Sequence, residues 1–80
     1  MDKDIRVVIV QDGDLYFAQC LEVNIAAQGT TRDEAMERLR IAFNAEARER
    51  GETIFDLGPA PEEYVRMYES EPTRHHLQVA

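Results

Sequence analysis

Hydrophobic residues cluster in three short stretches within the first thirty positions of the chain. The first, residues 5–10, is rich in β-branched side chains, and the second covers residues 15–21. A third and shorter stretch lies at about residues 25–28 and ends at a glycine. Residues 11–14 contain the Asp and Gly types that suit a hairpin turn. The pattern therefore predicts three strands in an antiparallel meander.

The predicted hairpin is apolar on both of its faces. Val7 and Ile9 point to one side of the first strand, whereas Val8 and Val10 point to the other. The second strand alternates in the same way, and Phe17 lies on one of its apolar sides. Because one helix covers only one face of a sheet, the second face needs another cover. We expect either the C-terminal segment or another subunit to pack there.

Residues 32–50 carry the clearest helical pattern of the chain. Apolar side chains recur at three- and four-residue spacing and form one stripe: Ala35, Leu39, Ala42, Phe43 and Ala47. Thr31 and Glu34 have the spacing of a capping box, in which the Thr31 hydroxyl accepts from the Glu34 amide and the Glu34 carboxylate reaches back to the Thr31 amide. Gly51 suits the end of the helix.

The last thirty residues predict a second, shorter helix. Pro61 fits its first turn, and Glu62 and Glu63 place negative charge at the positive end of the helix. Its apolar face consists of Tyr64, Met67 and Tyr68. We expect Pro72 to stop this helix and residues 75–80 to form a last strand.

The length of 80 residues accommodates one domain. We expect an α+β fold with a small antiparallel sheet of three strands, with room for a fourth, one long helix packed on it and one short C-terminal helix. The domain spans residues 1–80, with its core at about residues 5–50 and an acidic extension at residues 52–80. No leader or membrane-spanning stretch is evident, so a cytoplasmic location is expected.

Charge narrows the range of partners. Sixteen acidic and nine basic residues give a net charge of −7. Such a surface repels phosphate backbones, so we expect no direct nucleic-acid binding. We also expect no membrane partner, because no apolar stretch is long enough to span a membrane. The acidic surface suits a basic protein partner, although acidity is also a common solubility feature.

Candidate chemistry is sparse. A metal-dependent nuclease needs several converging carboxylates, but only Asp12, Asp14 and Glu22 lie near the sheet, and the first two suit a turn for backbone reasons alone. The adjacent pair His75 and His76 points to opposite sides of a strand. The single Cys20 cannot form an internal disulfide. We therefore expect no catalytic, metal-binding or cofactor-binding residues and no cofactor.

The first fifty residues resemble the HicB-type antitoxin family in three features that occur in order. The acidic turn at residues 12–14 follows a hydrophobic strand. Residues 16–20, Tyr-Phe-Ala-Gln-Cys, are similar to the family's aromatic-x-Ala-x-Cys pattern. Residues 27–31, Ala-Gln-Gly-Thr-Thr, lead into Asp-Glu-Ala at residues 33–35 and then Leu39, like the family's Gln-Gly-x-Thr before an amphipathic helix.

This resemblance covers about residues 5–50 and implies a partial ribonuclease-H-like fold. Members of the family commonly neutralise a small basic ribonuclease of the HicA type, in prokaryotic toxin–antitoxin systems, by covering its active site. Many also carry a C-terminal DNA-binding domain, which this chain replaces with an acidic segment. The resemblance thus implies a non-catalytic antitoxin. The alternative is an orphan HicB-like domain that self-assembles and has no toxin partner.

Interfaces between proteins are enriched in aromatic and methionine side chains, and acids pair with a basic partner. The candidate interface residues are Asp12, Asp14, Tyr16, Glu62, Tyr64, Met67 and Tyr68. Phe17 is a further aromatic anchor of this kind. The same aromatic side chains would also suit the core of the domain, and exposed acids are often only solvated. We also expect a homo-oligomer at micromolar concentration.

Overall fold

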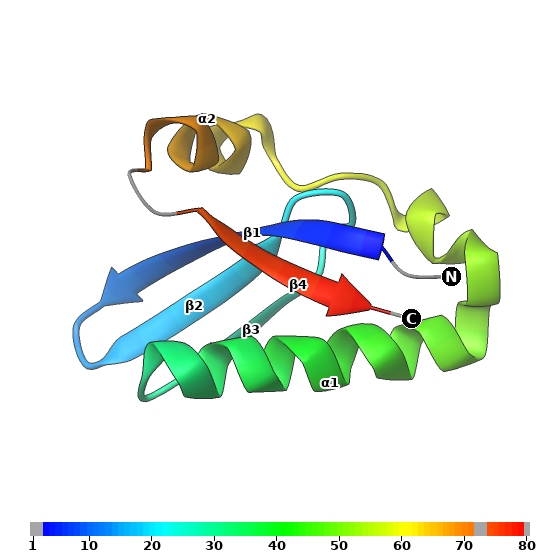
Figure 1. The fold of residues 1–80 in the computed structure, drawn as a ribbon, viewed down its shortest axis with the longest axis horizontal. Helices are drawn as coiled ribbons and strands as arrows, with labels where there is room; N and C mark the ends of the chain where they lie inside the picture. Colours follow the sequence, from blue (N-terminus) through cyan, green and yellow to red (C-terminus); the bar gives the residue numbers. More distant parts are fainter. Residues whose placement is uncertain (1–2, 72–73, 80) are drawn as a thin grey trace.

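The computed structural model describes residues 3–71 and 74–79 and shows a four-stranded sheet between two helices (Figure 1). The elements in chain order are β1 (Lys3–Asp12), β2 (Leu15–Cys20), β3 (Ala26–Gly29), α1 (Arg32–Arg50), the 3₁₀ helix η1 (Gly51–Leu57), α2 (Glu62–Ser70) and β4 (His75–Val79). The α+β fold predicted from the sequence is confirmed. Pro72, expected to stop the second helix, lies outside the described residues.

All neighbouring strands of the sheet are antiparallel, in the order β3-β2-β1-β4. The first three form the predicted meander, and β1 and β2 are joined by the turn at Gly13, whose positive φ of 62° suits glycine. The predicted last strand is present as β4, which pairs Leu77 with Ile5 of β1. The ribonuclease-H-like part of the expectation remains a prediction.

The main core lies between the sheet and α1. Ten buried side chains form it: Ile5, Val7, Ala18, Cys20, Val23, Ala35, Leu39, Phe43, Ile54 and Leu77. Side chains alternate between the two faces of a strand. The odd-numbered apolar residues of β1 and the even-numbered apolar residues of β2 therefore lie on this face. Burial raises the pKa of the Cys20 thiol to about 12, and nearby Glu22 acts in the same direction. The thiol is therefore neutral at physiological pH and serves as a small buried hydrophobe.

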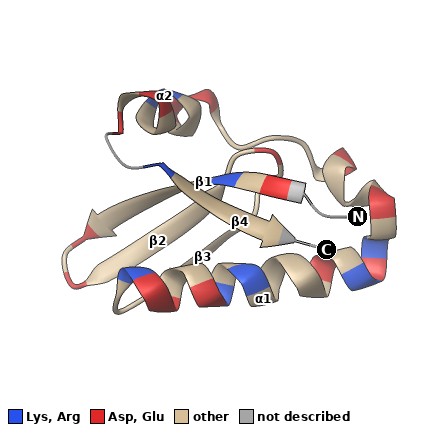
Figure 2. Cartoon of the chain, viewed as in Figure 1, with Lys and Arg blue, Asp and Glu red and all other residues tan. Residues whose placement is uncertain are grey.

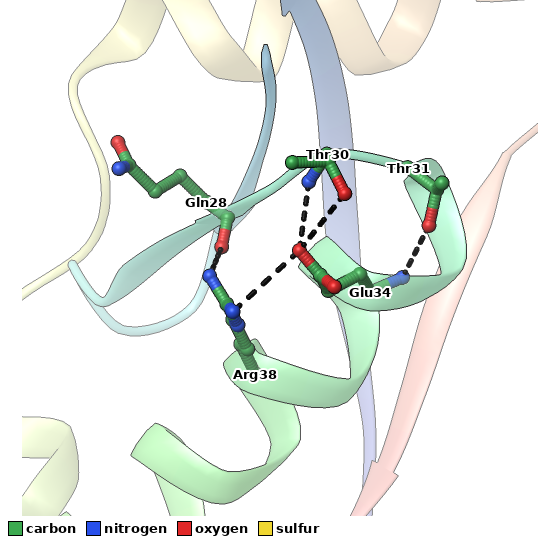
Figure 3. Close-up of polar contacts among 5 residues, drawn as sticks. All are labelled: Gln28, Thr30, Thr31, Glu34 and Arg38. Atoms are coloured by element: carbon green, nitrogen blue, oxygen red, sulfur yellow. Dashed lines mark hydrogen bonds and ion pairs between the residues drawn. The ribbon is translucent and has the colours of Figure 1, made fainter.

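The start of α1 is held by side-chain hydrogen bonds (Figure 3). The Thr31 hydroxyl accepts from the Glu34 amide at 3.0 Å, as the capping box predicts. The second half of that prediction is wrong, because the Glu34 carboxylate accepts from the Thr30 amide at 2.8 Å instead of the Thr31 amide. Arg38 lies 3.6 Å from the same carboxylate and donates to the Gln28 carbonyl at 3.2 Å. These contacts join β3 to the first turns of α1.

Acid should weaken this junction. The Thr30 amide chiefly, and then the Arg38 charge, lower the pKa of Glu34. A carboxyl whose pKa is lowered in the folded state stabilises the protein above its unfolded pKa, and this stabilisation is lost as the pH falls through the folded pKa. Glu34→Gln should therefore be less stable than the parent at pH 7 but similar to it near pH 2. Urea unfolding at both pH values measures this, with the exposed Glu49→Gln as control; an equal gap at both pH values would contradict it.

The opposite face of the sheet is covered by the C-terminal segment. Val8, Leu21, Ala60 and Tyr68 are buried together there, with Val10, Tyr64 and Val65 packed against them. In Figure 1, α2 and α1 lie on opposite sides of the sheet. Of the two covers that the sequence left open for this face, the C-terminal segment of the same chain is the one present. The C-terminal segment covers β1. The part of the same face that β2 and β3 form lies beside this segment.

Candidate functional site

A groove runs along the face of the sheet that carries α2. Its volume is about 410 Å³, and its lining residues are Val10, Gln11, Asp12, Phe17, Gln19, Ala26 and Tyr64. A second hollow of about 280 Å³ shares Phe17 and Ala26 with it and continues onto Ala27 and Gln28 of β3. The two hollows therefore form one surface, here called the β2–β3 groove, that extends from α2 to the edge of the sheet.

The register of the strands explains why this groove is apolar. Val10 pairs with Phe17, so both side chains point to the same face of the sheet. Tyr64 of α2 packs beside Val10. Because α2 lies over β1, the Phe17 side chain beyond it is only half-buried. An aromatic ring thus remains accessible at the centre of the groove.

The floor of the groove is fixed by Gln19, whose exposed fraction is only 7%. Its side-chain amide donates to the Cys20 carbonyl at 2.9 Å and to the Asn24 side-chain oxygen at 3.1 Å. These bonds hold the connection between β2 and β3. The Gln19 amide is therefore committed to the fold, and the groove presents mainly apolar surface to a partner.

Acidic side chains border the groove. Asp12 lines it at the end of β1, and Asp14 is exposed in the adjoining turn. Glu62 and Glu63 form the exposed first turn of α2, directly before Tyr64. Figure 2 shows acids both at the hairpin turn and on α2. A basic partner at the groove would thus meet Asp12 directly, with the other acids nearby on the hairpin turn and on α2, where Glu62 is paired with Arg66.

The remaining candidate residues lie elsewhere. Tyr16 is on the α1 side of the sheet, where it packs on the main core and the Arg32 guanidinium lies 5.5 Å from its ring centroid. Tyr68 is buried, with an exposed fraction of 6%, and its hydroxyl lies 2.8 Å from the His76 ring nitrogen Nε2. Met67 is 37% exposed on α2 but is not among the residues that line the groove.

Two of the seven candidates, Asp12 and Tyr64, therefore line the groove, and Asp14 and Glu62 lie next to them on the hairpin turn and on α2. Tyr16 and Tyr68 contribute to the internal packing of the domain. Sequence reasoning missed Val10 and Ala26 as groove residues, and it named Phe17 only as a general anchor. The sequence signal that could have identified them was the apolar character of both hairpin faces, because it indicated more apolar surface than one helix can cover.

Groups of three or more His, Cys, Asp or Glu side chains placed to hold a metal ion do not occur within residues 3–71 and 74–79. None of the helices in this described part is long and apolar enough to cross a membrane. The chain matches no family model, no curated protein and no solved structure.

Proposed function

We propose that this chain is a non-catalytic, HicB-like antitoxin that binds a small basic ribonuclease of the HicA type and covers its active site. The observation that carries the proposal is the apolar β2–β3 groove with acids on its border, in a chain of net charge −7. The resemblance of residues 5–50 to HicB-type antitoxins supplies the class of partner.

The groove supplies the short-range attraction in this proposal. Aromatic side chains in desolvated pockets account for much of the binding energy at protein interfaces. Phe17 of β2 and Tyr64 of α2 offer two such rings, and Val10 of β1 lines the groove with them. A hydrophobic side chain of the toxin would bury these rings and lose its own contact with water.

The acids supply the long-range attraction. Asp12, Asp14, Glu62 and Glu63 are exposed, so their charges steer a basic protein towards the groove and speed its association. Inhibition follows from position alone, because a bound protein excludes RNA from the surface that it covers. The acidic border also repels an RNA strand that approaches the same place.

Capture from cells of the source organism tests the proposal. A tagged chain should retain a small basic protein, and that protein should cleave RNA in isolation but not after this chain is added. Retention of the chain's own copies alone would favour the toxin-free, self-assembling domain. A captured protein whose RNA cleavage continues in the presence of excess chain would overturn the antitoxin proposal.

A further inference from the structure

The two edges of the sheet differ in how they are protected. At the β3 edge, Arg38 of α1 donates to the Gln28 carbonyl at 3.2 Å and so occupies an outward-facing acceptor. At the other edge stands β4, and in Figure 1 neither helix is drawn across it. An exposed edge strand is a template for pairing with another strand, unless charge, proline or a covering element prevents this.

The strand register identifies the outward-facing groups of β4. The Leu21 amide donates to the Arg6 carbonyl at 2.9 Å, so the backbone groups of Arg6 face β2. Backbone direction alternates along a strand, so Ile5 faces β4, where it pairs with Leu77. The backbone N–H and C=O groups of His76 and Gln78 therefore face outward. Within the described residues they have no hydrogen-bond partner.

The sequence of β4 contains none of the residue types that commonly protect an edge strand. Residues 75–79, His-His-Leu-Gln-Val, contain no lysine, no proline and no acid. Leu77 at the centre is buried on the α1 side of the sheet, with an exposed fraction of 5%. The strand thus combines an anchored centre with unsatisfied outer backbone groups.

We propose that β4 pairs antiparallel with β4 of a second copy, across a two-fold axis at Leu77, to give a continuous eight-stranded sheet. Each His76 then exchanges backbone hydrogen bonds with Gln78 of the second copy, and Leu77 lies opposite its own counterpart. A two-fold interface requires such a self-complementary patch.

The symmetric placement of the outward-facing groups favours a second copy as the occupant of this edge. Arg6 pairs with His76, and Asp4 pairs with Gln78, with all four side chains on the α2 side of the sheet. His76 and Gln78 lie at equal distances from Leu77 along β4, so a two-fold axis at Leu77 places each of them opposite the other in the second copy. The opposed side chains include no acid, and Arg6, which pairs with Glu22 of its own chain at 2.7 Å, lies one strand farther from the axis. By contrast, two copies that met at the β2–β3 groove would bring their acidic side chains close together, and these negative charges would repel each other.

Molecular mass in solution tests the dimer. Wild type should show twice the monomer mass by sedimentation equilibrium at micromolar concentration. Gln78→Pro removes an N–H that the isolated fold does not use, and proline is tolerated where an edge N–H faces solvent. Because two symmetric hydrogen bonds are lost, its dissociation constant should rise about tenfold or more, with an unchanged circular dichroism spectrum.

Two further variants complete the test. Gln28→Pro places the same substitution at the outward-facing position of β3 and should remain dimeric. Gln78→Lys keeps every backbone N–H and should also weaken the dimer, because lysine on an edge strand opposes pairing. This variant tests the proposal if Gln78→Pro fails to fold. A monomeric wild type, or folded β4 variants that stay dimeric, would overturn the proposal. Ribonuclease inhibition should persist in Gln78→Lys, since the groove is intact, so the two proposals fail separately.

Discussion

Gly29→Ala should destabilise the domain by about 3 kcal/mol, at the upper end of what overpacking costs. A Cβ atom at position 29 would lie 2.6 Å from the Ala35 amide nitrogen and 2.9 Å from the Glu34 carbonyl carbon. Both are backbone atoms of α1, so relief requires β3 and the helix to separate. An 80-residue domain has a total stability of about 4–12 kcal/mol, so the loss is a large share of it.

Urea unfolding measures this loss. The matched control is Gly13→Asn, in the β1–β2 turn, where an added Cβ would contact nothing within 4 Å and where asparagine tolerates the positive φ. That control should stay within about 0.5 kcal/mol of wild type. Equal stability of Gly29→Ala and wild type would show that β3 does not approach α1 this closely.

Phe17→Ala should weaken inhibition of the ribonuclease about thirtyfold. This is the loss expected for a central aromatic anchor of about 2 kcal/mol, and Phe17 is common to both hollows of the groove. The inhibition constant from RNA cleavage measures it, and circular dichroism checks that the variant is folded.

The control for Phe17 is Ile41→Ala. Ile41 is 57% exposed on α1, which covers the other face of the sheet, so its truncation removes apolar surface away from the groove. Its inhibition constant should match that of wild type. Equal inhibition by folded Phe17→Ala and by wild type would exclude the groove as the binding surface.

Local chemistry explains which parts of the fold could be predicted. The predicted helix at residues 32–50 matches α1 because Thr31 and Gly51 determine its ends through nearby backbone groups. The hairpin is likewise determined by its turn residues and alternation. The partner of Glu34 was not predictable in this way, since the Thr30 and Thr31 amides are neighbours and the entry path of the chain decides between them.

The candidate site depends on contacts that are distant in sequence. Tyr16 and Phe17 are adjacent aromatics on opposite faces of β2, and their alternation alone does not say which face α1 covers. Tyr64 and Tyr68 share one face of α2, yet Tyr68 reaches His76 of β4 and becomes buried, whereas Tyr64 borders the groove. The position of α2 on the sheet decides these outcomes, and it results from packing at Val8 and Leu21.

The most direct test of the antitoxin proposal is titration of RNA cleavage by the captured basic protein with this chain. Cleavage should fall in proportion to added chain and cease near one chain per ribonuclease, because each protomer carries one β2–β3 groove. Cleavage that continues unchanged in a large molar excess of folded chain would contradict the proposal.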